Sequence, residues 1–208
     1  MEDKIIFRSY DKKDRQALED IIRKTWNYDK FSSPKTAARL ARVYLNSCLA
    51  NQTFTRVAAV NGQPVGIIMG KHIGKYKRSP ILDIKLLISI ASLYITKEGR
   101  SVSKIFGYVS SIDEELLKSC RKKYQGEVAF FAINSQYRGK GIGKKLFHSL
   151  LSYMRSEHIQ QFFLFTDTSC NYQFYEHQGM TRGCQKEHSF QIADQKCKMT
   201  FFLYEYSI

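Results

Sequence analysis

The sequence lacks several features that would assign it to a common class of protein. Its 208 residues contain five cysteines, an odd number, and no CxxC pair, so neither a disulfide framework nor a zinc site is indicated. The longest apolar run, residues 86–95, is half as long as a membrane span. No basic start followed by an apolar core marks a signal peptide. These absences predict a reduced, cytoplasmic protein with no membrane partner and no metal.

Acidic side chains are also scarce. Asp and Glu number 19 against 33 Lys and Arg, which gives a net charge of +14. Residues 71–126 hold 12 basic and 5 acidic side chains, and so carry half of that excess. Because 43% of the residues are hydrophobic and 13% are aromatic, the chain is expected to fold around a core. The charge favours polyanionic partners.

The most informative stretch is residues 127–154. Residues 128–133 form a short apolar run that is typical of a strand buried on both faces, and residues 134–140 are polar and contain glycine, as loops do. Apolar residues then recur at helical spacing from Ile142 to Met154. This stretch therefore predicts a strand, a loop and a helix.

The chemistry of this stretch lies where the loop meets the helix. Glycines there allow backbone dihedral angles that a side chain disfavours and let the chain approach a ligand closely. The first turn of a helix offers N–H groups without intrahelical partners, and its dipole favours negative charge. Four cations surround the turn: Arg138, Lys140, Lys144 and Lys145. The pattern predicts a site for a pyrophosphate.

The spacing RGKGIGKK separates this loop from two better-known phosphate loops. A Walker-type loop requires a Ser or Thr after its Lys, and a dinucleotide fingerprint requires GxGxxG early in a βαβ unit. The sequence instead resembles the coenzyme A loop of the GNAT superfamily of N-acetyltransferases, [Q/R]-x-x-G-x-[G/A], with Arg138, Gly141 and Gly143 at its fixed positions. Residues 171–180, NYQFYEHQGM, resemble a second signature of that family.

The resemblance implies an α/β (α+β) fold of the GNAT type. Its sheet would be twisted, mixed and mostly antiparallel, with splayed parallel central strands and flanking helices. Periodicity and turn signals agree with that element order, predicting strands at 4–8, 54–60, 65–69, 128–133, 162–167, 180–191 and 197–206. Helices are expected after Asp11, after Ser33, from Ile142 and at 171–178.

Residues 72–126 depart from the family's usual layout. We interpret them as a helical insertion in a single domain spanning residues 1–208, with helices at 81–95 and at 113–124, the second capped by Asp113. The insertion could be a purely structural elaboration, a lid over the acceptor pocket or the surface of a homodimer. The sequence leaves all three open.

The resemblance also implies roles for particular residues. Tyr175 would protonate the leaving thiolate, or else only pack on the cofactor arm. Glu127 would be the general base through water, or else a solvated carboxylate at the start of a strand. The aromatic residues Trp26, Tyr28 and Phe31 would line the acceptor site or pack a helix corner. The implied cofactor-binding residues are Phe131, Ala132, Ile133, Arg138, Gly139, Lys140, Gly141, Ile142, Gly143, Lys144 and Asn171.

The predicted function is therefore transfer of an acetyl group from acetyl-CoA, as cosubstrate, to a primary amine of a small molecule or peptide by direct attack. Two alternatives stay open. One is a basic nucleic-acid-binding protein on the same scaffold, although the sequence matches no nucleic-acid reader motif and predicts no specific nucleic-acid partner. The other is a module that binds acyl-CoA without catalysis.

Overall fold

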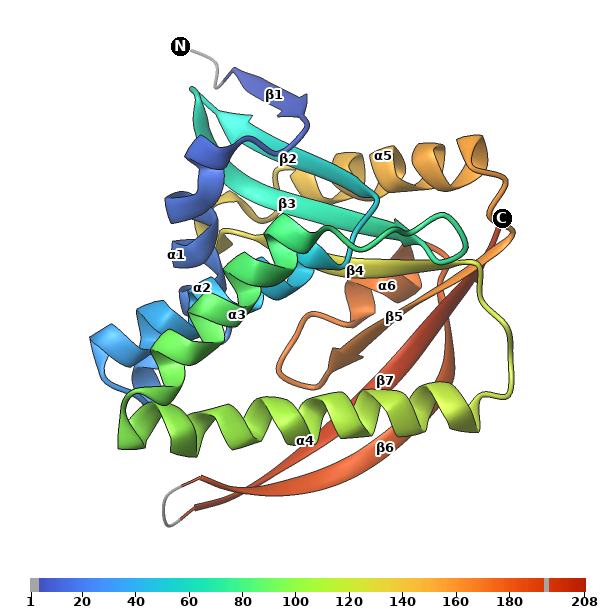
Figure 1. Ribbon diagram of the computed structural model, residues 1–208. Helices are drawn as coiled ribbons and strands as arrows, with labels where there is room; N and C mark the ends of the chain where they lie inside the picture. The colour runs from blue at the N-terminus through green and yellow to red at the C-terminus, as the bar shows by residue number, and fades with distance from the viewer. Residues whose placement is uncertain (1–3, 193–194) are drawn as a thin grey trace.

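The computed structural model describes residues 4–192 and 195–208 and arranges them as a seven-stranded mixed sheet flanked by helices (Figure 1). The strands lie in the order β1-β2-β3-β4-β5-β7-β6. In chain order the elements are β1 (Ile5–Arg8), η1 (Lys12–Asp14), α1 (Arg15–Thr25), η2 (Tyr28–Lys30), α2 (Pro34–Ala50), β2 (Phe54–Val60), β3 (Gln63–His72), α3 (Pro80–Tyr94), α4 (Lys97–Ser119), β4 (Gly126–Ile133), η3 (Ser135–Tyr137), α5 (Ile142–Ser156), β5 (Gln161–Asp167), α6 (Gln173–His177), β6 (Thr181–Ile192) and β7 (Gln195–Ser207).

The pairing of the strands confirms the predicted fold class. All neighbouring strands are antiparallel except β4 and β5, which are parallel. Their pairing is recorded only at Gly126 with Phe162 and at Glu127 with Phe163. Beyond these pairs the two strands diverge, so the centre of the sheet opens toward the carboxyl ends of β4 and β5.

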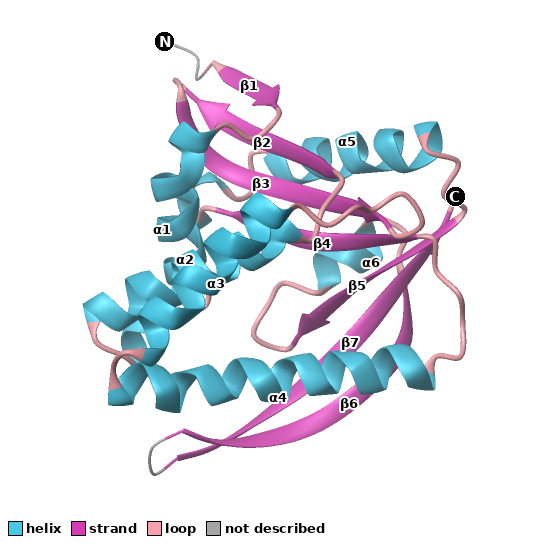
Figure 2. Cartoon of the chain, viewed as in Figure 1, coloured by secondary structure: helices cyan, strands magenta, loops and turns pink. Residues whose placement is uncertain are grey.

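Helices cover both faces of the sheet (Figure 2). On one face α1 and α2 pack against β2, β3 and β4 around the buried side chains of Leu18, Leu40 and Ile67. On the other face α5 buries a stripe that includes Leu146, Phe147 and Leu150. The strands β2, β3 and β4 each contribute side chains to both clusters, so the centre of the sheet joins the two halves of the core.

Local sequence signals explain where several elements begin or turn. Asp11 and Asp14 form a capping box, and the Ser33 hydroxyl caps α2 with Pro34 in its first turn. The capping box starts a 3-10 turn, so α1 itself begins at Arg15. Asn61 and Gly62 have φ of 50° and 84°, as a tight hairpin turn requires. The predicted strands at 180–191 and 197–206 imply a hairpin turn at 193–195, of which residues 193–194 lie outside the described residues.

The insertion differs from its prediction. Helix α3 matches the expected range, but α4 begins at Lys97, capped by the Thr96 hydroxyl, and runs without a break to Ser119. Asp113 is therefore in the middle of a helix and does not cap one. Residues 96–112, between the two predicted helices, are rich in Gly, Ser and Arg. Their apolar residues nevertheless recur at helical spacing and pack inward, at Val102, Ile105, Phe106, Val109 and Ile112.

Helix α4 is attached at both ends and crosses β6 and β7 (Figure 1). Near its start, Glu98 accepts hydrogen bonds from the N–H of Ser33, at 2.7 Å, and from the Ser33 hydroxyl, at 2.6 Å. After its end, Lys122 pairs with Glu205 at 2.6 Å. These contacts fix the face of α4 that looks toward the sheet.

A disulfide adds a third attachment and corrects the prediction that the protein is reduced. Cys120, the C-cap of α4, is joined to Cys184 of β6, with their Cα atoms 6.0 Å apart. The two residues are 64 positions apart in the chain. Sequence spacing gave no sign of the bond because it depends on α4 lying across β6.

The outer surface of α3 is unusually apolar. Ile81, Leu87, Ile88 and Ile95 are each more than 60% exposed. This surface is where the expected homodimer interface would lie, and that expectation stays a prediction. Among the described residues, no helix combines the length and the hydropathy that a membrane span needs.

The buried apolar stripe of α5 allows a test of how this helix is oriented against the sheet. The side chain of Leu146 is fully buried, so Leu146→Ala should lower the free energy of unfolding by about 2–5 kcal/mol, measured by urea denaturation. His148→Ala is the matched control, because His148 lies on the same helix and is exposed, and it should change stability by less than about 0.5 kcal/mol. Similar losses for both variants would contradict the orientation of α5.

Candidate active site

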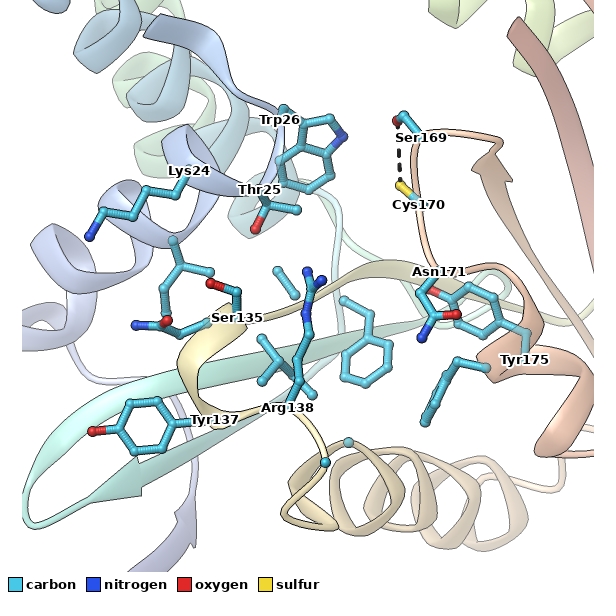
Figure 3. Close-up of a pocket in the computed structure, with 18 of the residues that line it drawn as sticks. Lys24, Thr25, Trp26, Ser135, Tyr137, Arg138, Ser169, Cys170, Asn171 and Tyr175 are labelled. Carbon is cyan, nitrogen blue, oxygen red and sulfur yellow. Dashed lines mark hydrogen bonds between the residues drawn. The ribbon is translucent and has the colours of Figure 1, made fainter.

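A cavity of about 550 Å³ lies at the open centre of the sheet, between α1, β4, the start of α5 and α6. Three segments supply its labelled side chains in Figure 3: the end of α1 with Trp26, the loop after β4, and the segment from Ser169 to Tyr175. The sequence-predicted residues that line it are Phe131, Ala132, Ile133, Arg138, Gly139, Gly141, Gly143, Lys144, Asn171 and Tyr175. Residues far apart in the chain thus meet in one cavity. We call it the first cavity.

The glycine loop closes one end of the first cavity. Gly139 and Gly141 have φ of 78° and 74°, in the left-handed region that L side chains rarely adopt. Gly141 is the N-cap of α5, and the first hydrogen bond of the helix runs from the Lys145 N–H to the Gly141 carbonyl at 3.1 Å. The preceding N–H groups of the first turn have no such partner and carry the positive end of the helix dipole. This end of the cavity suits an anion.

Gly143 is needed for a different reason, which is close packing. A Cβ atom at this position would lie 3.0 Å from Ile133 Cδ1 and 3.3 Å from Phe174 Cε2. The glycine therefore lets the first turn of α5 approach both β4 and α6. This contact brings the anion-binding turn beside the strand and beside Tyr175.

The divergence of β4 from β5 exposes the backbone of β4. The Asn134 N–H donates to the Val65 carbonyl of β3 at 2.8 Å. Because backbone groups alternate in direction along a strand, the N–H and C=O of Ile133 and Phe131 point away from β3, into the gap. These groups can bind an extended amide-containing ligand as an added strand would.

Cations gather around the first cavity. Lys24, Arg138 and Lys144 line it, from α1, the loop and α5. No motif in the sequence marked Lys24 as part of the site. Two predicted cofactor-binding residues do not line the cavity with their side chains: Lys140 places its ammonium 5.1 Å from the centre of the Tyr137 ring, and the Ile142 side chain is buried in the core. At Ile142 only the backbone N–H is suited to a ligand.

Tyr175 lies where α6 meets the gap. Its ring centroid is 6.3 Å from that of Phe131 and 5.5 Å from that of Phe174. Burial, reinforced by the neighbouring Cys170 and Asp167, raises the pKa of Tyr175 well above its usual range. The phenol therefore keeps its proton at neutral pH and is available as a donor.

Glu127 is not brought to this site. It pairs across the sheet with Lys71 and sits where β4 and β5 are still hydrogen-bonded, before the strands diverge. Burial raises the pKa of Glu127, while Lys71 and a hydrogen bond with Asn51 oppose that shift. The Glu127 carboxylate does not line the first cavity. Its role as a general base acting through water therefore stays a prediction.

A second cavity, of about 330 Å³, lies beneath α4. It shares Trp26, Phe131, Ser169, Cys170 and Tyr175 with the first cavity, so the two meet beside the Tyr175 ring. Tyr28 and Phe31 line it, as expected for an acceptor site. Asp113 and Asp167 also line it. Neither carboxylate was predicted from the sequence to belong to the site, and Asp113 was expected to cap a helix.

Comparisons with known proteins identify the family. A family model for the Acetyltransferase (GNAT) family matches residues 15–180, which is most of the chain. The chain therefore belongs to the GNAT acetyltransferase family and is an acyltransferase, and the resemblance seen in the sequence is confirmed. A comparison with curated protein sequences finds no match.

Solved structures share the fold at low sequence identity. A protein from Pyrococcus horikoshii has a TM-score of 0.61 and 16% identity, with 99% of each chain covered. An N-acetyltransferase from Staphylococcus aureus has a TM-score of 0.55 and 14% identity, with 98% of each chain covered. PaiA N-acetyltransferase from Thermoplasma acidophilum, solved in complex with coenzyme A, has a TM-score of 0.52 and 14% identity, with 99% of each chain covered.

Proposed function

We propose that this protein transfers an acetyl group from acetyl-CoA to a primary amine of a small molecule or peptide, by direct attack of the amine on the thioester. One observation carries the proposal. The glycine loop at the start of α5, the exposed backbone of β4 and the Tyr175 phenol all line a single cavity. A solved relative in complex with coenzyme A supports the choice of donor.

Each part of the cavity suits one part of the donor. The first turn of α5, with Arg138, Gly139, Gly141, Gly143 and Lys144, would bind the pyrophosphate through N–H groups and positive charge. The backbone of Phe131 and Ile133, with the Asn171 amide, would hold the pantetheine arm in the gap between β4 and β5. This arrangement would bring the thioester to the junction of the two cavities.

Tyr175 would then supply the proton for the departing thiolate, and the proton that the attacking nitrogen loses would return to the Tyr175 oxygen through water. Its raised pKa favours a neutral phenol that can donate to sulfur. Backbone N–H groups of β4 would face the thioester oxygen and stabilise the negative charge that develops on it. The amine would approach from the second cavity, which opens beside the Tyr175 ring.

Binding of the donor is tested by Gly141→Asp. We expect the affinity for coenzyme A, measured by calorimetry, to fall at least about tenfold. A carboxylate about 4 Å from a pyrophosphate costs ~1–4 kcal/mol, depending on the local dielectric. Unchanged affinity in the folded variant would contradict the assignment of the phosphate site.

Gly62→Asp is the matched control for that experiment. Gly62 also has positive φ, at 84°, and has nothing within 4 Å of the position of its Cβ, as is true of Gly141. It lies in the β2–β3 turn, so Gly62→Asp adds the same charge and similar backbone strain away from the cavity. Its coenzyme A affinity should equal that of the wild type.

Turnover is tested by Tyr175→Phe, using an amine found by mass spectrometry in an acetylation screen. Both kcat and kcat/KM should fall by about 10²–10⁴-fold, with acetyl-CoA binding nearly unchanged, because the lost interaction forms only as the carbon–sulfur bond breaks. Tyr172→Phe is the control, since Tyr172 packs on Phe202 and does not line either cavity. If Tyr175→Phe acetylates the amine at the wild-type rate, Tyr175 is a packing residue.

A further inference from the structure

The lining of the second cavity differs in charge from the rest of the chain. Although the chain has a net charge of +14, no lysine or arginine is among the described residues that line this cavity. Its charged lining side chains are the carboxylates of Asp113 and Asp167. The other walls are mostly aromatic or aliphatic, including Phe31, Phe106, Val109 and Met199. The cavity therefore combines an apolar body with local negative charge.

Asp113 has no partner of its own. Among the residues that the structure describes, no side chain or backbone N–H donates to its carboxylate, and it forms no ion pair. Asp167, by contrast, accepts a hydrogen bond from the Ser169 N–H at 2.7 Å. A partly buried carboxylate without a protein partner is solvated less well than an exposed one, so a ligand that brings positive charge or a hydrogen-bond donor binds there favourably.

The position of Asp113 is fixed by the fold. The next turns of α4 pack Ile112 and Leu116 against Phe163, Phe201 and Leu203 of the sheet. The neighbouring residue Glu114 points to solvent, where it pairs loosely with Lys118 at 3.8 Å. Asp113 thus faces the cavity because the buried stripe of α4 faces the sheet.

We propose that the second cavity binds the acceptor as a small ammonium compound with an apolar or aromatic body, and that Asp113 and Asp167 select it by its charge. This inference rests on the proposed acetyl transfer. The cavity volume of about 330 Å³ is near the lower end of the range for small-molecule sites. A polyamine or an aminosugar fits less well, because each would bury further charges or hydroxyls against Phe31, Phe106 and Val109.

The charge selection has a pH dependence. Burial, with repulsion from Asp167 and Glu127, raises the pKa of Asp113 to about 7. Only the ionised Asp113 carboxylate attracts an ammonium group. The contribution of Asp113 to the binding affinity is therefore present above pH 7 and is lost as the pH falls through that value. The titratable groups that face Asp113 or line the cavity with it are Asp167, Glu127, Tyr28, Tyr44, Cys170 and Tyr175.

Binding measurements test the inference without relying on turnover. The probes are 2-phenylethylamine, its neutral counterpart 2-phenylethanol, and spermidine, each titrated into the coenzyme A-saturated protein at pH 8. We expect the amine to bind at least about tenfold more tightly than the alcohol and than spermidine. Lowering the pH to 6 should reduce the difference between amine and alcohol. Equal affinities for amine and alcohol, or tighter binding of spermidine, would overturn the inference.

Two variants test whether the Asp113 carboxylate is the charge that selects the amine. Asp113→Asn should remove most of the preference for amine over alcohol and leave coenzyme A affinity unchanged. Glu114→Gln removes the same charge from the adjacent, exposed position of α4 and should leave the preference intact. An unchanged preference in folded Asp113→Asn would assign the selection to other groups and overturn the role of Asp113.

A parallel assay separates this inference from the proposed function. Acetylation of 2-phenylethylamine is followed by mass spectrometry with the same proteins. A charge preference in binding without any acetylated product would leave the cavity assignment standing and contradict acetyl transfer. Acetylation of the amine without a charge preference would support the transfer and contradict the inference.

Discussion

The arrangement of the site depends on the divergence of β4 from β5. Their parallel pairing is recorded only at Gly126 and Glu127, so the remaining backbone of β4 borders a gap on that side. The N–H and C=O of Phe131 and Ile133 consequently point away from β3, and both residues line the first cavity. The same gap lets the first turn of α5, held close by Gly143, and the Tyr175 ring line one cavity. If the two strands paired along their full length, these groups would be separated or covered.

The two cavities that meet at this gap are lined by side chains of opposite charge. The first cavity carries Lys24, Arg138 and Lys144, together with the positive end of α5, whereas the second carries two carboxylates. The two cavities meet at Trp26, Cys170 and Tyr175. An anionic donor and a cationic acceptor would therefore enter from opposite sides and meet beside the phenol. The fold supplies the first cavity, and the helix α4 of the insertion supplies one wall of the second.

The sequence was sufficient where a local backbone conformation dictates the residue. Gly141 could be recognised because a left-handed N-cap before a basic helix favours glycine, and the strand–loop–helix order around it follows from periodicity. The role of Asp113 could not be recognised, because it depends on α4 continuing through a segment rich in Gly and Ser. The Cys120–Cys184 bond and the second cavity likewise depend on tertiary packing. Glu127 was assigned by its place on β4, but the strands diverge only beyond it.

The most direct test of this account is a crystal structure of the protein with coenzyme A bound. The account predicts the pyrophosphate against the N–H groups of the first turn of α5, the pantetheine arm along Phe131 and Ile133, and the sulfur beside the Tyr175 hydroxyl where the two cavities meet. A pyrophosphate bound away from Gly141, or a thiol directed away from Tyr175, would contradict it.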